Sequence, residues 1–309
     1  MKISKILYLK LPLDELLPIR NNFYLGSYQQ AINSISTSSN TTSPNNSLER
    51  RLILLRSYLA QKNYRQASSA IAKEDEKVPE LLAFKLLADY FQFPEKKENL
   101  LNSMKQLLSS VDVSTGFGEG GGVPVFAATL FYNEGLFEDA LKILTARQKD
   151  LECASFIVQI YLKMNRPELA KKELQGIRSW ADDATLAQLV EAWVDAFSGD
   201  EKKFQDAYYI FEELASSKVA TSKLLNGQAV CRIKAGRFEE AEAILVESLN
   251  KGGNDPETLI NLIVCTISSG KDSSKFLNLL KETSPKHPYL EELALKESHF
   301  DRCCGRFSN

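Results

Sequence analysis

The chain has 309 residues, of which 44% are hydrophobic and 25% charged, so it can bury a large core. Its 38 Lys and Arg residues balance 40 Asp and Glu residues, and a net charge of −2 argues against binding to nucleic acid or to an anionic membrane surface. Five cysteines, an odd number in a chain without a recognisable secretion signal, are expected to be free thiols in a reducing compartment.

The first twenty residues are expected to form a separate N-terminal leader. Their sequence, MKISKILYLKLPLDEL and onward, is basic and then apolar, as in a secretion signal. Lys5 and Lys10 interrupt the apolar stretch, however, and the run from Ile6 to Leu9 is shorter than the 7–15 residues that a signal core needs. No other run approaches the length of a membrane span. We therefore expect a soluble, cytosolic protein with no direct membrane insertion.

Residues 21–286 are expected to form one α-helical solenoid, and the stretch from Leu224 to Pro256 shows its unit most clearly. Leu225, Ala229 and Ile233 recur at steps of four, which places them on one helical face. Gly236 then provides a turn, because glycine adopts the left-handed conformation without steric cost. A second helix follows, and its periodic residues are Phe238, Ala241 and Leu245. Two antiparallel helices joined in this way match the tetratricopeptide repeat (TPR), although Arg232 stands where an aromatic residue is usual.

The same aromatic-x-x-Ala step after a Gly or polar turn recurs along the chain. From Ala31 to Phe276 the chain advances 245 residues in seven steps, or 35 a step, close to the TPR period of 34. The fold class predicted is all-α, a TPR-like helix-turn-helix solenoid with a right-handed superhelix; the alternative is a generic helical bundle with chance spacings. The copies are Tyr28-Ala31, Tyr64-Ala67, a degenerate one near Leu101, Phe137-Ala140, Pro167-Ala170, Phe204-Ala207, Phe238-Ala241 and Gly270-Phe276.

Two polar or glycine-rich stretches are expected to be mobile loops of the solenoid, near residues 36–47 and 114–123. The second contains Gly116, Gly118 and Gly121, which spell G-x-G-x-x-G. A dinucleotide-binding loop needs a strand before this motif, and the preceding segment is predicted to be helical. No Gly-Lys-Ser/Thr follows, which also excludes a P-loop. We therefore expect no nucleotide or other cofactor.

No catalytic or metal-binding constellation is predicted. The only two histidines are His287, in a turn before Pro288, and His299, four residues before Cys303. Two ligands on one helix fall short of a closed tetrahedral zinc site. Cys303 and Cys304 lie in a C-terminal helix and tail, expected over residues 287–309, and they could be lipidated, although the last four residues lack the prenylation cysteine.

A partner-binding surface is predicted on the helix after Pro256, ETLINLIVCTI. Leu259, Leu262 and Ile263 should pack inside the repeat, so the helix is apolar on a second face as well, and such a helix must be covered. The cover is either a partner protein or the C-terminal helix from Tyr289 to Phe300 folding back. The candidate residues are Ile260, Val264 and Ile267, extended by Val230 and by Ile233, which could equally be core.

Beyond the repeat pattern, the chain resembles the epsilon subunits of coatomer over nearly its whole length. The resemblance rests on segments that a TPR does not demand, above all ECASFIVQIYLKMNRPELAKKEL (152–174) and QDAYYIFEELA (205–215). Others are DELLPIRNNFYLGSYQQAIN (14–33), SYLAQ (57–61), SVDVS (110–114), ATLAQLVEAWV (184–194), LLNGQAVC (224–231), PETLINLIV (256–264) and HPYLEELALKESHFDR (287–302). The leader, the glycines at 116–122 and the tail after Arg302 depart from it.

The resemblance implies a non-enzymatic subunit of the COPI vesicle coat in Golgi-to-ER and intra-Golgi transport, located in the cytoplasm and peripherally on Golgi membranes. It further implies that the array binds and stabilises the C-terminal region of the coatomer α subunit. The competing function is a TPR peptide-binding adaptor or co-chaperone. A chaperone-type carboxylate clamp would need Lys and Asn on the concave face, where the last two repeats have mainly Val and Ile.

Overall fold

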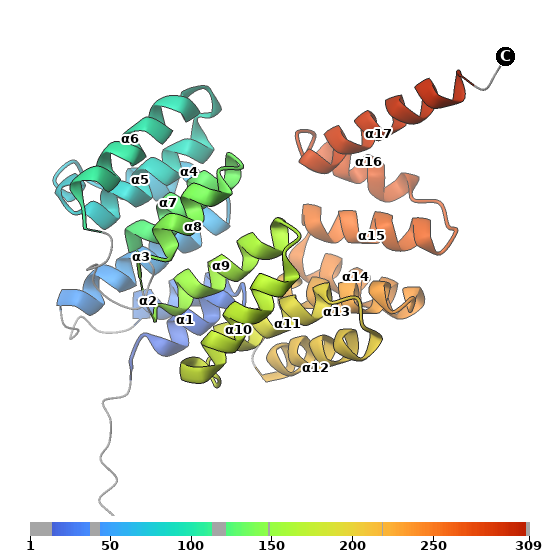
Figure 1. The fold of residues 1–309 in the computed structure, drawn as a ribbon, viewed down its shortest axis with the longest axis horizontal. Helices are drawn as coiled ribbons and strands as arrows, with labels where there is room; N and C mark the ends of the chain where they lie inside the picture. Colours follow the sequence, from blue (N-terminus) through green and yellow to red (C-terminus); the bar gives the residue numbers. More distant parts are fainter. Residues whose placement is uncertain (1–13, 38–43, 113–121, 148, 218, 307–309) are drawn as a thin grey trace, which may run out of the picture. The chain divides into compact units, whose positions relative to one another are not determined.

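The computed structural model describes residues 14–37, 44–112, 122–147, 149–217 and 219–306, and every regular element in these ranges is a helix (Figure 1). The predicted all-α fold is therefore confirmed. Residues 38–43 and 113–121, including Gly116, Gly118 and Gly121 of the glycine motif, lie outside the described residues, as does most of the leader.

The chain divides into two compact units, Met1–Cys153 and Ala154–Asn309. In the first, successive helices pack on one another in chain order, with each odd-numbered α-helix from α1 to α7 opening a pair. Its elements are α1 (Leu17–Tyr24), α2 (Tyr28–Thr37), α3 (Pro44–Ala60), α4 (Tyr64–Ser69), the 3-10 helix η1 (Asp75–Lys77), α5 (Pro79–Gln92), the 3-10 helix η2 (Pro94–Lys96), α6 (Lys97–Ser110), α7 (Gly122–Asn133) and α8 (Phe137–Leu144).

The second unit follows the same plan, and helix α9 (Leu151–Lys163) begins just before the boundary. Its other helices are α10 (Pro167–Ala181), α11 (Thr185–Phe197), α12 (Glu201–Ser217), α13 (Ser222–Lys234), α14 (Phe238–Gly252), α15 (Pro256–Ser268), α16 (Ser274–Thr283) and α17 (Pro288–Cys304). Each helix from α10 to α16 packs on the next one in the chain. Helix α13 also contacts α15, so alternate helices are neighbours, as in stacked helical hairpins.

The turns between paired helices lie where the sequence pattern placed them. Gly236 has a φ of +73°, between the end of α13 at Lys234 and the start of α14 at Phe238. Lys62 and Asn165 take the same left-handed conformation in their turns, with φ values of 62° and 56°. The repeat therefore fixes the backbone conformation of the turn even where the residue is not glycine.

An alanine lies at the crossing of each regular pair. Ala229 and Ala241 have no exposed surface, and they belong to one core cluster with Leu245, Leu262 and Cys265. A side chain this small lets two helix axes approach to roughly 8–10 Å. The alanines of the other pairs are equally buried: Ala31, Ala67, Ala140, Ala170 and Ala207.

The degenerate copy near Leu101 corresponds to α5 and α6. Their connection runs through Phe93, whose backbone is not helical, and through η2. Met104 of α6 is fully buried in place of an alanine.

Each of the two stretches expected to be loops includes residues that are helical in the structure. Helix α2 continues to Thr37 and α3 begins at Pro44, inside the stretch expected near 36–47. Helix α7 begins at Gly122, inside the stretch expected near 114–123. The one-domain organisation expected for residues 21–286, between the leader and the C-terminal segment, stays a prediction.

Arg232 replaces the missing aromatic residue of the α13–α14 repeat with a stacked guanidinium. Its Cζ lies 3.6 Å from the centroid of the Tyr208 ring of α12. Its Nη1 donates to Gln205 Oε1 at 2.9 Å, and its Nε lies 3.1 Å from Glu240 Oε2. A planar cation on an aromatic face fills the space of a ring and joins α12, α13 and α14.

Candidate partner-binding surface

The five predicted surface residues lie on two neighbouring helices of the second unit but differ in exposure. Val264 and Ile267 of α15 are 38% and 57% exposed, while Val230 of α13 is half-buried. Ile233 packs against the core cluster around Ala229, and Ile260 packs against the cluster around Leu259 and Ile263. Leu259, Leu262 and Ile263 are buried as predicted.

Helix α17 covers only one end of this surface. Tyr289 and Leu290, in its first turn, pack on the same cluster as Ile260. Beyond that turn α17 has no buried residue, and Leu295 and Phe300 are 57% and 69% exposed. The C-terminal helix therefore leaves Val264 and Ile267 uncovered in this structure.

Two asparagines lie between the apolar residues of α13 and α15, and the sequence pattern did not single them out. Asn261 Nδ2 donates to Asn226 Oδ1 at 2.9 Å, and Asn226 Nδ2 donates to Thr258 Oγ1 at 2.8 Å. Their positions are 35 residues apart, about one repeat. Two asparagines separated by about one repeat were the sequence feature from which this contact could have been predicted. We define the α13–α15 surface by Asn226, Val230, Asn261, Val264 and Ile267.

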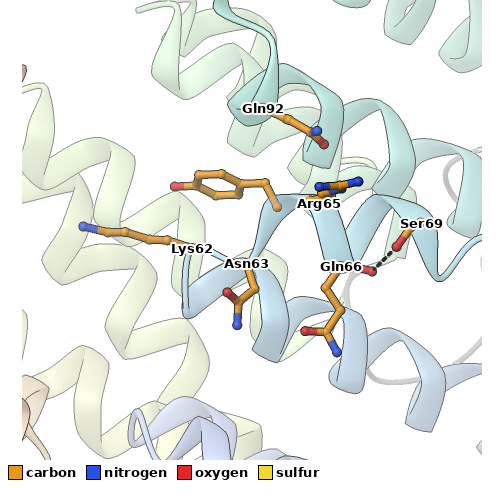
Figure 2. Close-up of a pocket in the computed structure, with 7 residues that line it drawn as sticks. Lys62, Asn63, Arg65, Gln66, Ser69 and Gln92 are labelled. Carbon is orange, nitrogen blue, oxygen red and sulfur yellow. Dashed lines mark hydrogen bonds between the residues drawn. The ribbon is translucent and has the colours of Figure 1, made fainter.

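Two cavities of the first unit share Tyr64. One, of about 560 Å³, is polar and open, and Figure 2 shows Lys62, Arg65 and Gln92 around it. The other, of about 310 Å³, is lined largely by apolar side chains of α1, α3, α5 and α7, among them Phe23, Leu87 and Phe126. Together the two cavities form an apolar recess next to the cationic side chains of Lys62 and Arg65.

Arg56, in the apolar cavity, belongs to a buried polar cluster. Its guanidinium lies 4.5 Å from the centroid of Phe23 and pairs with Glu152, with Nη2 3.0 Å from Oε2. Tyr24 donates its hydroxyl to Glu152 Oε1 at 2.7 Å. Burial raises the pKa of Tyr24 well above its ordinary value, and the Glu152 carboxylate adds to this. Burial alone would lower the pKa of Arg56, but Glu152 outweighs it, so the pair stays ionic.

The residues with possible metal or catalytic chemistry have structural or solvent-exposed positions. His287 Nδ1 accepts from the backbone N–H of Tyr289 at 3.3 Å and so caps α17. Cys303 and Cys304 are both exposed. Within the described ranges no three His, Cys, Asp or Glu side chains come together to hold a metal ion. In the same ranges, no helix combines the length and the apolarity that crossing a membrane requires.

Comparison with known proteins decides the family. The sequence profile of the coatomer epsilon subunit family matches residues 12–308. The chain belongs to the coatomer epsilon subunit family. Coatomer subunit epsilon-1 of Arabidopsis thaliana is 38% identical over 96% of this chain and 98% of its own length. The epsilon subunits of Dictyostelium discoideum and Caenorhabditis elegans are 36% and 32% identical, over 96% and 94% of this chain and 99% and 97% of their own.

Solved structures support the fold of this epsilon family member. A tetratricopeptide repeat protein from Parabacteroides merdae covers 86% of this chain and 97% of its own, with a TM-score of 0.58 and 14% identity. The Cut9–Hcn1 structure covers 91% of this chain and 55% of its own, with a TM-score of 0.57 and 14% identity. The TPR-like fold is thus confirmed. Epsilon subunits are structural components of the coatomer, and the expectation that the chain is not an enzyme is confirmed by that membership.

Proposed function

We propose that this chain is the subunit of the COPI coatomer that binds and stabilises the α subunit, through that subunit's C-terminal region. It acts in Golgi-to-ER retrograde and intra-Golgi vesicle transport. The observation that carries the proposal is the epsilon-family match over residues 12–308, in a chain with an open apolar row on α15.

The chemistry of the α13–α15 surface supports protein binding. Val264 and Ile267 lie one helical turn apart, and an exposed apolar patch rimmed by polar side chains marks an interaction site. The amides of Asn226 and Asn261 add hydrogen-bonding groups without charge. This combination fits a protein partner better than it fits nucleic acid, which is bound through cationic side chains.

The location follows from the same partner. We place the chain in the cytoplasm and on the cytoplasmic side of Golgi membranes and COPI vesicles, held there through the other coatomer subunits rather than by insertion into lipid. A peripheral attachment of this kind needs a protein interface and no membrane-spanning helix.

Affinity capture tests the complex. The tagged chain, captured from cytosol of a eukaryotic cell, should bring down a stoichiometric set of large coatomer subunits, measured by quantitative mass spectrometry. Recovery of chaperones without those subunits would contradict the proposal and favour the co-chaperone function.

A second experiment tests the surface with purified components. The double variant Val264→Asp/Ile267→Asp should fold, because both side chains are exposed, and should lose binding to the C-terminal region of the α subunit. Ile260 is left unchanged because it packs on the core. The matched control is Val246→Asp on α14, where the valine is 41% exposed, and it should bind normally. Equal binding by both variants would exclude the α13–α15 surface.

A further inference from the structure

The side-chain amide of Asn261 is held in one orientation by a chain of hydrogen bonds that begins in the core. Thr258, fully buried, donates its hydroxyl to Asp255 Oδ2 at 2.9 Å and therefore accepts from Asn226 Nδ2 at 2.8 Å. A second hydrogen of Asn226 Nδ2 goes to the Ser222 carbonyl oxygen at 2.8 Å. Both hydrogens of that amide are used, so its Oδ1 must face Asn261.

Asn261 has hydrogen-bonding capacity to spare. One hydrogen of its Nδ2 goes to Asn226 Oδ1. Among the described residues, its Oδ1 and its second hydrogen have no partner, and the side chain is half-exposed. The network therefore leaves one acceptor and one donor, fixed in direction, beside the open side chains of Val264 and Ile267.

An acceptor and a donor on one planar amide complement a peptide group, which offers an N–H and a C=O. An extended segment has such groups free along its whole length, whereas a helix satisfies its own main chain except in its terminal turns. In an extended segment alternate side chains point to one side, where they would meet Val264 and Val230. The residues that define the surface carry no charge, which matches a neutral main chain with apolar side chains.

We propose that Asn261 binds the main chain of an extended, apolar segment of the partner, and that Asn226 is the residue that positions its amide. The inference rests on the proposed function, since it takes the C-terminal region of the α subunit as the partner. It goes beyond that function by assigning the form of the bound segment and the group that recognises it. Val264 and Ile267 contact the segment's side chains.

Isothermal titration of the full chain with the purified C-terminal region of the α subunit tests this. Asn261→Ala removes two hydrogen bonds to main chain and should weaken binding roughly 10-fold or more. The matched control Asn250→Ala changes an exposed asparagine of α14 and should bind as the parent does. Circular dichroism and thermal melting establish that each variant is folded. If Asn261→Ala does not fold, Asn261→Ser, which keeps a small polar side chain, is measured in its place.

A separate binding measurement tests whether Asn226 positions the amide of Asn261. Asn226→Ala should also weaken binding, and in the double variant with Asn261→Ala the two losses should not add, because Asn226 acts only through Asn261. Additive losses would overturn this part of the proposal.

The outcomes separate the inference from the function on which it rests. If Val264→Asp weakens binding and Asn261→Ala does not, the partner binds the surface without main-chain contacts, as a helix would, and the inference is wrong. If neither variant changes binding, the α13–α15 surface is not the interface. If the parent chain itself does not bind the α-subunit fragment, the proposed function fails first.

Discussion

At the scale of single residues, one ion pair of the first unit lies deep in its interior. Arg56 and Glu152 have side chains only 12% and 8% exposed, and both guanidinium nitrogens Nη1 and Nη2 lie 3.0 Å from the carboxylate. Charges at this depth are stable only together, because each compensates the desolvation of the other. The pair joins α3 to the start of α9.

Removing one charge should therefore cost far more than removing a hydrogen bond to it. Glu152→Gln removes the carboxylate that Arg56 contacts directly, and should lower the free energy of unfolding by about 3 kcal/mol or more. Tyr24→Phe keeps the ion pair and should cost about 1.5 kcal/mol. The exposed pair Glu247–Lys251 provides the control, since Glu247→Gln should cost less than about 1 kcal/mol. Urea denaturation measures all three, and equal losses would mean that Arg56 is hydrated.

Cysteine reactivity should follow burial. Burial raises the pKa of Cys231 from 9.0 to about 12, and it also raises the pKa values of Cys153 and Cys265. At pH 8, a thiol reagent such as Ellman's reagent should modify Cys303 and Cys304 rapidly and the other three only in denaturant. Cys303→Ser/Cys304→Ser should abolish the rapid phase.

The raised pKa of Cys231 also makes the free energy of unfolding depend on pH. The unfolded chain releases the Cys231 proton near pH 9.0 and the folded chain only near about 12. The stabilisation from the neutral thiol is therefore complete below pH 9 and is lost as the pH rises from 9 to about 12. In the Cys231→Ala variant, the free energy of unfolding should therefore depend less on pH between pH 9 and about 12.

At the scale of helices, the local pattern was enough to place most of the turns and crossings. Gly236, Phe238 and Ala241 predicted the end of α13, the start of α14 and the buried contact between them. They could do so because turn conformation and helix packing distance depend on residues within one hairpin.

The exposure of side chains outside the contact between paired helices could not be predicted from the local pattern. Ile233 and Ile267 occupy equivalent positions, three residues before Gly236 and Gly270, yet Ile233 packs on a core cluster and Ile267 is open. The difference depends on which side chains the neighbouring helices supply, and a periodic pattern does not contain that information. The hydrogen bond between Asn226 and Asn261 joins side chains of two different helices, so the periodic pattern did not predict it either.

Overpacking the α13–α14 crossing tests the assigned register. Ala241→Leu places three extra carbon atoms where no surface is exposed and should cost about 1–3 kcal/mol of unfolding free energy. Ala243→Leu, on the exposed side of the same helix, is the control and should change stability by less than about 0.5 kcal/mol. Identical thermal melting of the two variants would show that the crossing lies elsewhere.

At the scale of the whole molecule, stability is shared among neighbouring hairpins, and a binding partner that contacts several of them adds to it. In such an array each repeat is braced by the next, so binding at one pair raises the free energy of local opening in the adjacent ones. The α13–α15 surface spans two consecutive repeats of the second unit. Binding there should be measurable as protection of the backbone.

Hydrogen–deuterium exchange of the free chain and of its complex with the α-subunit fragment should locate that protection. At a free fragment concentration of 100 times the dissociation constant, binding adds about 2.7 kcal/mol to the opening free energy, or about 100-fold slower exchange. The largest slowing is expected in α13 and α15, a smaller one in α14 and α16, and none for Val264→Asp at the same concentration. Protection confined to α1, α3, α5 and α7 would instead move the interface to the apolar cavity around Phe23 and Arg56.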